Sequence, residues 1–151
     1  MPQPATLPPQ TVALIGETCL CRRVQRAGRV IGRHFDEAFR HLGLNNWQFT
    51  LLMALHMPGP PTVNDLAVEL GMDRTTMTRN LRPLERRGLL GIHPDAEDGR
   101  VRRIVLTEAG RALLAQALPH WRAANAAIAA RLPDEVALAG FRFGLDAIAQ
   151  D

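Results

Sequence analysis

The middle of the chain carries two short patterns of apolar residues at helical spacing. TVNDLAVEL covers residues 62–70, and DRTTMTRNLRPLERR covers residues 73–87. Each pattern begins with a residue that can cap a helix N-terminus, Thr62 or Asp73, and each is followed directly by a glycine that can end a helix. Asp65 completes a capping-box-like T-x-x-D at the first pattern. The chain therefore predicts two consecutive helices joined by a tight turn.

The period changes from helical to strand-like immediately after the second pattern. LLGIHP (89–94) and RVRRIVLT (100–107) have the character of strands, and an acidic tip with a glycine at 95–99 joins them into a hairpin. A helix pair followed by a hairpin is the order of elements in a winged helix-turn-helix, whose second helix enters the major groove of DNA. The expected fold class is mainly α with a small β-hairpin wing (α+β).

Long helical patterns flank this central part on both sides. We predict one helix over residues 11–42, a second helix around Trp47, and two more helices over 107–131 and 133–149, the first of these capped by Thr107. The first helix has an apolar stripe that we expect to be buried: Leu20, Val24, Ala27, Ile31, Phe35, Ala38 and Leu42.

The flanking helices are too apolar for helices that lie alone on a surface. We therefore expect the terminal helices of two chains to pair into a homodimer, which would present two copies of the winged element to DNA. The domain prediction is a single domain over 1–151, with a winged helix-turn-helix at 44–106. The helical dimerisation part would be formed by 11–43 and 107–151.

Positive charge is concentrated on the central part of the chain. Residues 74–103 hold eight arginines and four acids, a net charge of +4, whereas the whole chain carries only +3. Basic residues gathered on one helix and its hairpin are typical of phosphate binding, so we predict double-stranded DNA as the partner.

The composition argues against an enzyme. The chain has no Ser, Lys or Tyr, which excludes a serine nucleophile and the lysine of a P-loop. No His–His or Cys–His spacing resembles a metal finger, so we expect no catalytic residue, metal ion or cofactor. No apolar run is long enough to span a membrane. Cys19 and Cys21 lie two residues apart in the predicted helix over 11–42, so they point to opposite sides of it and cannot bridge within one chain without breaking it, which suits a reducing cytoplasm.

Residues 44–110 resemble the MarR family of bacterial transcriptional regulators. LNNWQFTLLMAL is similar to the second helix of that family, and VNDLAVELGMDRTTMTRNLRPLERRGLL is similar to its helix-turn-helix. DAEDGRVRRIVLTEAG resembles the wing signature of the family, D-x-R followed by a strand that ends in L-T-x-x-G. The resemblance implies a homodimer joined through the first and last helices, and a small-molecule pocket between the helices.

The candidate DNA contacts lie on the second central helix and on the wing. On the helix we expect Arg74, Thr75, Thr76, Thr78 and Arg79 to approach DNA, with Arg79 suited to the O6 and N7 atoms of a guanine. On the wing we expect contacts from Asp98, Arg100 and Arg102. Arg100 matches the wing arginine of the family, which resembles a minor-groove probe, and Asp98 would hold the shape of the tip.

Two different signals could control DNA binding. Candidate ligand-binding residues are His34, Phe35, Trp47, Met53 and Trp121, although aromatic residues at helical spacing are also typical of an ordinary core. Cys21 matches by position the reactive cysteine of the hydroperoxide-sensing branch of the family. That branch supports its thiolate with tyrosine hydroxyls, and this chain has no tyrosine. A plain buried thiol is therefore the alternative for Cys21.

These observations predict a cytoplasmic, homodimeric repressor that binds an inverted repeat and releases it when a small ligand, aromatic or carboxylated, binds. A thiol-oxidation switch at Cys21 is the alternative within this class. A dimeric helical interaction module without DNA binding is the alternative from another class, and the arginine at the wing tip argues against it.

Overall fold

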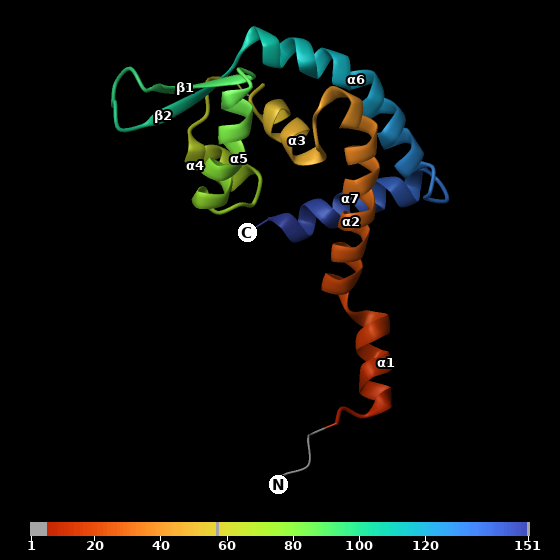
Figure 1. The fold of residues 1–151 in the computed structure, drawn as a ribbon. Coiled ribbons are helices and arrows are strands. Elements are labelled where there is room, and N and C mark those ends of the chain that lie inside the picture. Colours follow the sequence, from red (N-terminus) through yellow and green to blue (C-terminus); the bar gives the residue numbers. More distant parts are fainter. Residues whose placement is uncertain (1–5, 57, 151) are drawn as a thin grey trace.

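The chain is built from helices, with one β-hairpin between α5 and α6 (Figure 1). This computed structural model describes residues 6–56 and 58–150. The elements follow in the order α1 (Pro9–Thr18), α2 (Leu20–Phe39), the 3-10 helix η1 (Arg40–Leu42), α3 (Asn46–Ala54), α4 (Val63–Glu69), α5 (Arg74–Arg86), β1 (Leu90–Pro94), β2 (Arg102–Leu106), α6 (Glu108–Ala129) and α7 (Glu135–Ala149). The predicted fold class, mainly α with a two-stranded wing, is confirmed.

Side-chain caps begin the helices around the hairpin. At α4, the Thr62 hydroxyl accepts the Asp65 N–H at 3.1 Å, and the Asp65 carboxylate accepts the Thr62 N–H at 2.8 Å. At α6, the Thr107 hydroxyl accepts the Gly110 N–H at 3.1 Å. These bonds satisfy N–H groups that have no partner within the helix, so the helix starts are set by local sequence. The three caps expected from the sequence, at Thr62, Asp73 and Thr107, are present.

The core lies where α3, α4, α5 and the hairpin meet. Its largest fully buried side chains are Phe39, Leu51, Leu52, Leu66, Met77, Leu81, Leu84 and Ile104. Phe39, at the end of α2, stacks on Phe49 of α3 with ring centres 4.6 Å apart. The core therefore connects the central helix pair to the end of α2, and through it to the long helices.

The base of the hairpin is fixed from two sides. On one side, the Ile104 N–H donates to the Pro61 carbonyl at 2.9 Å, so β2 is hydrogen-bonded to the segment just before α4. On the other side, the Thr107 hydroxyl donates to the Gly88 carbonyl at 2.7 Å. Gly110 lies so close to this junction that a Cβ atom built there would be 2.1 Å from the Leu89 carbonyl oxygen. The start of α6 can reach this position only because residue 110 has no side chain.

The prediction of one helix over residues 11–42 is wrong. Helix α1 ends at Thr18, and α2 begins at Leu20 after Cys19, whose ψ of 107° is extended. The Thr18 hydroxyl donates to the Leu14 carbonyl at 2.7 Å, a local bond that competes with continuation of a helix. The Cys19 sulfur accepts the Arg22 N–H at 3.4 Å, so Cys19 caps α2 instead of lying within a helix. The argument that the helix keeps Cys19 and Cys21 apart therefore does not hold.

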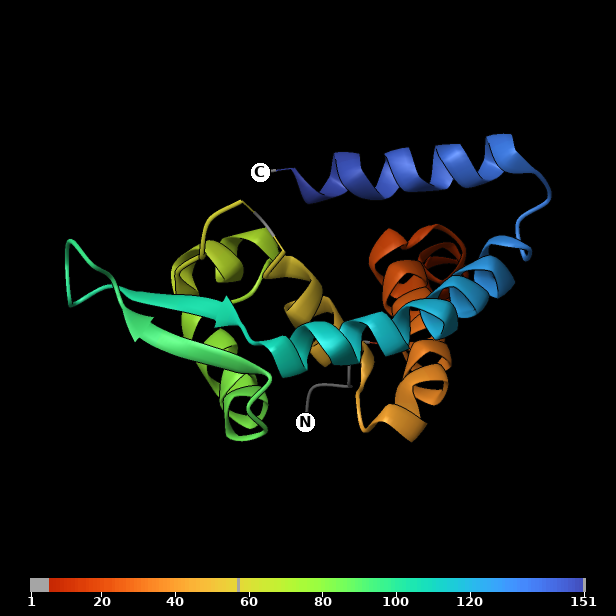
Figure 2. The ribbon, with the colours of Figure 1, turned by 90° about the horizontal axis from the view of Figure 1, so that it is seen from above.

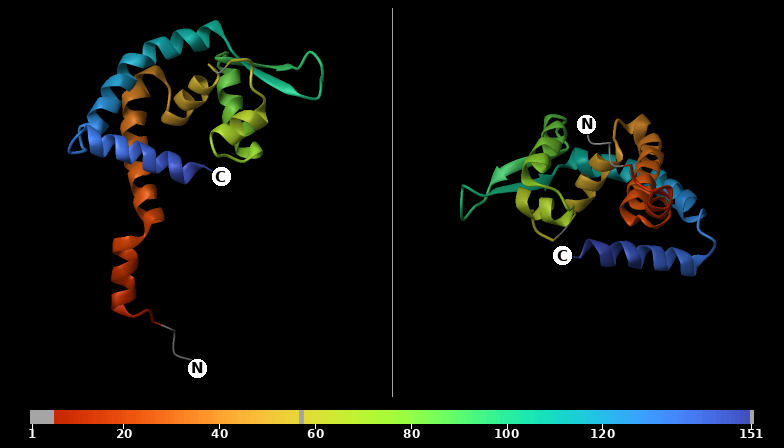
Figure 3. Two further views of the ribbon diagram at one scale, coloured as in Figure 1. Left: turned by 180° about the vertical axis from the view of Figure 1, so that it is seen from behind. Right: turned by 90° about the horizontal axis from the view of Figure 1, so that it is seen from below.

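The predicted apolar stripe of α2 is exposed at its start and half-buried from Ala27 onward. Leu20 is 68% exposed and Val24 is 47% exposed, and the residue of α2 that is fully buried, Phe39, lies outside the stripe. The expectation of a buried face along the whole stripe is wrong for a single chain, because α6 packs along only part of α2. Figures 1 and 3 show α1 and the start of α2 extending away from the other helices.

Helix α7 also presents apolar side chains to solvent. It runs back from the end of α6 as a separate rod (Figure 2). Val136 is 81% exposed and Phe143 is 76% exposed, and Ile148 is exposed as well. Both ends of the described chain therefore carry apolar surface that this single chain does not cover. None of the described helices combines the length and the apolar character needed to cross a membrane.

Candidate nucleic-acid interface

The start of α5 is shaped by Asp73. Its carboxylate accepts the Thr76 N–H at 2.8 Å and the Thr76 hydroxyl at 2.7 Å. These hydrogen bonds from Thr76 lower the pKa of Asp73. The ionised carboxylate then interacts favourably with the positive end of the helix dipole. The hydroxyl of Thr76 is occupied by this cap. The structure therefore places Thr76 in the capping interaction and not beside the other predicted DNA contacts.

One face of α5 forms an exposed basic surface, which we call the α5 basic face. Its side chains line a surface hollow of about 420 Å³: Arg74, Thr75, Thr78, Arg79 and Arg82. Met77, Leu81 and Leu84 occupy the opposite face and are buried. The structure thus brings together four of the five predicted residues of this helix and adds Arg82. The spacing of residues 75, 78, 79 and 82 already indicated a shared face, because residues three and four apart are neighbours on a helix.

The tip of the wing is organised by Asp95, which the sequence had marked only as one of several acids. One carboxylate oxygen of Asp95 accepts the N–H groups of Glu97 and Asp98 at 2.8 and 3.1 Å. The other oxygen accepts the Arg103 Nε–H at 2.6 Å. The bond from Arg103, followed by the two backbone N–H groups, lowers the pKa of Asp95 to about 2. A depressed carboxyl pKa means that this contact is fully formed above the usual value of 3.8 and is lost only as the pH falls toward 2.

The three wing residues predicted to meet DNA all lie at the exposed end of the hairpin. The Asp98 carboxylate accepts the Arg100 N–H at 3.0 Å, so Asp98 positions the backbone of Arg100 while the Arg100 side chain remains exposed. Arg102 is exposed as well. Arg103 points to the other side, where it binds Asp95 and donates to the Pro60 carbonyl at 3.1 Å. Because successive side chains of a strand point to opposite faces, Arg102 is exposed to solvent, whereas Arg103 makes contacts within the fold.

Only two of the five predicted ligand-binding residues share a cavity. Phe35 and Trp121 line a hollow of about 290 Å³ between α2, α3 and α6, together with Gly28, Ile31, Gly32, Phe39, Asn46, Phe49 and Thr50. Trp47 is 51% exposed in the first turn of α3, and Met53 is 43% exposed in its last turn, because Phe49 and Leu52 take the inward positions of that helix. His34 does not line this hollow either, and its Nε2 atom is buried without a hydrogen-bond partner.

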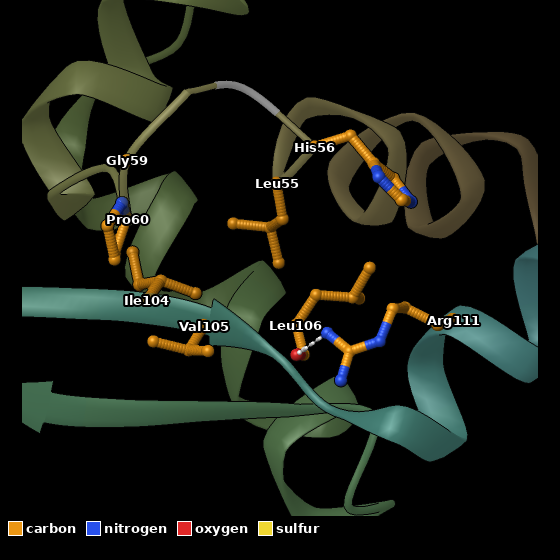
Figure 4. Close-up of a pocket in the computed structure, with 8 residues that line it drawn as sticks. All are labelled: Leu55, His56, Gly59, Pro60, Ile104, Val105, Leu106 and Arg111. Carbon is orange, nitrogen blue, oxygen red and sulfur yellow. Dashed lines mark hydrogen bonds between the residues drawn. The ribbon is translucent and has the colours of Figure 1, made fainter.

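A further hollow, of about 220 Å³, lies at the base of the wing (Figure 4). It is lined by Leu55, His56, Gly59, Pro60, Ile104, Val105, Leu106 and Arg111. The guanidinium of Arg111 donates to the Leu106 carbonyl at 2.9 Å and pairs with Glu108 at 3.0 Å. Its charge is therefore engaged in joining α6 to β2.

Cys21 is exposed near the start of α2, which contradicts the expectation of a buried thiol. The Gln25 side-chain amide donates a hydrogen bond to the Cys21 sulfur at 3.2 Å. Both Cys19 and Cys21 are free thiols in this structure. Within the described residues, no group of three or more His, Cys, Asp or Glu side chains is arranged to hold a metal ion.

Known proteins share both the central sequence and the fold. Residues 42–101 match the model of the MarR family. The chain is similar to the M. tuberculosis transcriptional regulator MosR, solved in complex with DNA, with 38% identity over 87% of this chain and 97% of that chain and a TM-score of 0.73. It is also similar to CouR from Rhodococcus jostii RHA1 bound to p-coumaroyl-CoA, with 26% identity over 87% of this chain and 92% of that chain and a TM-score of 0.75.

A curated relative matches over a shorter region. The HTH-type transcriptional regulator YwoH of Bacillus subtilis is 28% identical over 89 residues, which is 59% of this chain. The chain spans 64% of the length of that relative.

Proposed function

The chain belongs to the MarR family of transcriptional regulators, and on this premise we propose that it is a homodimeric repressor that binds a short inverted repeat in DNA. The α5 basic face carries the proposal. Three exposed arginines and two threonines lie there on one side of a helix whose other side is anchored in the core. A helix held in this way can enter the major groove as a rigid unit.

The wing supplies a second contact with the same duplex. In this proposal Arg79 recognises a guanine in the major groove, and Arg100 at the wing tip enters the neighbouring minor groove. Asp95 and Asp98 hold the tip in shape through hydrogen bonds to its backbone, which keeps Arg100 at a defined place relative to α5. The two arginines would therefore differ in role, one selecting a base and the other strengthening attachment.

The exposed apolar faces of α1, α2 and α7 support a homodimer. Val12, Leu14 and Ile15 of α1, Leu20 and Val24 of α2, and Val136 and Phe143 of α7 are all exposed in a single chain. Apolar surface of this extent on terminal helices is typical of a site for another protein. A second copy of the chain would cover it and would place two α5 helices on successive major grooves. The residues 11–43 and 107–151 would form this dimerisation part.

The footprint of the protein on DNA tests this proposal. With DNA from the region next to its own gene, we expect protection of two half-sites centred about one helical turn, roughly 10 base pairs, apart. A single protected half-site, or uniform binding without a footprint, would contradict the proposed arrangement.

Substitution of the two arginines separates their roles. Arg79→Ala should weaken binding to the cognate site by about 1–3 kcal/mol and relax the preference at one base pair of each half-site. Arg100→Ala should weaken binding to many sequences more evenly. The measurement is a competition titration against a set of single-base variants of the site, and equal loss of preference in both variants would show that the roles are assigned wrongly.

We propose that a small aromatic ligand in the cavity between α2, α3 and α6 releases the DNA. Phe35, Phe39, Phe49 and Trp121 form its aromatic walls. The residues that line it include no basic side chain, which favours an uncharged aromatic group over a carboxylate at this place. The cavity lies between α2, α3 and α6, so a ligand bound there would contact all three helices. Such a ligand would favour one spacing of the two α5 helices in the dimer and would shift the population of dimers toward that spacing.

Oxidation of a thiol is a second candidate signal, and the exposure of Cys21 favours it. An exposed thiol is accessible to oxidants, and the chain leaves the helical conformation only two residues earlier, at Cys19. The hydrogen bond from Gln25, however, comes from a neutral amide, which supports a thiolate less than a charged donor does.

A peroxide titration distinguishes the two signals. We expect a mild organic hydroperoxide to leave the DNA affinity of the reduced protein unchanged, because no tyrosine hydroxyl is present to activate Cys21. Fluorescence anisotropy with labelled DNA measures this, with Cys21→Ala and Cys19→Ala as matched variants. Release of DNA by peroxide that disappears only in Cys21→Ala would make oxidation the signal in place of the ligand.

A further inference from the structure

Two histidines that are far apart in the sequence meet on the surface of the folded chain. His41 lies in η1 and His120 lies in α6, and their Nε2 atoms are 3.0 Å apart. The two ring centres are 4.2 Å apart, and the ring planes make an angle of 71°. Neither residue belongs to the α5 basic face, to the wing or to the cavity between α2, α3 and α6. The function proposed above therefore does not explain the pair.

The two rings are within hydrogen-bond distance, one nitrogen donating and the other accepting according to the tautomer, but the bond is not in line. An in-line N–H···N bond of this length would keep the ring centres about 5 Å apart, because each nitrogen lies at the rim of its ring. The observed separation is shorter, so the rings are inclined and a direct bond between the nitrogens would be bent. A bent bond at a solvent-accessible position contributes little to stability.

The distance between the nitrogens fits two ligands of one metal ion. With metal–nitrogen bonds of roughly 2.0–2.1 Å, two imidazole nitrogens on one ion lie about 2.9 Å apart in a square-planar site and about 3.3 Å apart in a tetrahedral site. The observed 3.0 Å falls between these values. Two rings that both face one ion would have their centres roughly 4.5–5.3 Å apart, so the rings, whose centres are 4.2 Å apart, would turn slightly when the ion binds. We propose that His41 and His120 form a two-histidine site for a late first-row divalent metal ion, such as Ni²⁺, Cu²⁺ or Zn²⁺.

The surroundings of the pair define the kind of site. The carboxylate of Glu37, one turn before His41, is paired with Arg40. Among the described residues no third protein ligand joins the pair, so water would complete the coordination. Two imidazoles and water suit Ni²⁺, Cu²⁺ and Zn²⁺, whereas Mg²⁺ and Ca²⁺ prefer oxygen ligands. The site is therefore expected to exchange its metal ion readily and to bind Ni²⁺, Cu²⁺ or Zn²⁺ in preference to Mg²⁺ or Ca²⁺.

A metal ion at this place would join two parts of the fold. η1 leads into Gly43, whose carbonyl accepts the Arg87 guanidinium at 2.6 Å, and Arg87 directly follows α5. His120 lies in α6, the helix that packs along α2. The ion would thus hold the turn that contacts the end of α5 against α6. Because it binds only the folded arrangement of the two histidines, it should also raise the melting temperature.

Calorimetric titration of the full chain with Ni²⁺ tests the site. We expect one ion to bind per chain and the melting temperature to rise with it. His41→Gln and His120→Gln should each weaken binding at least about tenfold, since loss of a group that only orients a ligand already costs about 10–100-fold. Glutamine keeps a hydrogen-bonding side chain of similar reach at each position, and the circular dichroism spectrum without metal shows whether each variant is folded.

Two further variants exclude other sites. His56→Ala removes an exposed histidine elsewhere, and Cys21→Ala removes an exposed thiol; both should bind Ni²⁺ as the unmodified protein does. The proposal is overturned if the unmodified protein binds no Ni²⁺, if either glutamine variant keeps the full affinity, or if Cys21→Ala is the variant that loses it.

Discussion

The affinity of this protein for its DNA site is expected to fall by about three to five decades when the salt concentration rises from about 50 to about 200 mM. Each chain carries five exposed arginines on the α5 basic face and the wing: Arg74, Arg79, Arg82, Arg100 and Arg102. In a dimer these could neutralise roughly six to ten phosphates, and each neutralised phosphate releases condensed counterions from the duplex. Fluorescence anisotropy over a series of salt concentrations measures the slope.

Variants that each remove one arginine show which side chains contribute to the slope of affinity against salt concentration. Arg102→Gln should lower its magnitude by about one for each phosphate contact that is lost. Arg122→Gln removes an exposed arginine in α6, away from α5 and the wing, and should leave the slope unchanged. A salt response that is flat in the unmodified protein would show that α5 and the wing do not meet the phosphate backbone as proposed.

Substitution of Gly110 by alanine is expected to cause the largest loss of stability of any conservative change in the wing region. The new Cβ would lie 2.1 Å from the Leu89 carbonyl oxygen and 2.6 Å from Leu106 Cδ1. The first of these neighbours is backbone, so the start of α6 would have to move away from the hairpin. Overpacking of this kind typically costs about 1–3 kcal/mol, and contact with backbone places the expected loss at or above the upper end of that range. Thermal and denaturant unfolding measure the loss.

Gly28→Ala is the matched control for that substitution. Gly28 also lies within a helix, α2, but a Cβ built there meets nothing within 4 Å. Because alanine loses less conformational freedom than glycine in a helix, this variant should gain roughly 0.5–1 kcal/mol. If both alanine variants unfolded alike, the close approach at Gly110 would not be the reason for the glycine in the L-T-x-x-G motif.

The elements of the central part could be predicted because their determinants are local. Thr62, Asp73 and Thr107 each bond to an N–H three residues later, and the glycines at 71 and 88 adopt the positive φ that ends a helix. Capping bonds of this kind depend only on residues within one turn, so the sequence contains all the information needed to place them. The partition of α5 into a buried and a basic face follows from helical spacing in the same way.

Several of the predicted positions depend on which surfaces a neighbouring element covers. Leu20 and Val24 have the spacing of buried residues but lie beyond the part of α2 on which α6 packs. Trp47 and Met53 have the size of pocket residues, but Phe49 and Leu52 hold the inward positions of α3. Periodicity identifies an apolar face, and only the tertiary structure decides whether another element reaches it.

The sequence by itself determined the order of the elements from α3 to α7, the caps, the wing and the basic character of α5, since each of these arises from interactions within a few residues. Only the tertiary structure decided which groups from distant parts of the chain meet. It brought Phe35 and Trp121 to one cavity and His41 to within 3.0 Å of His120, and it placed Gly110 against the Leu89 carbonyl. These contacts join residues on different elements, and their distances are set by how the elements pack, which no local pattern records.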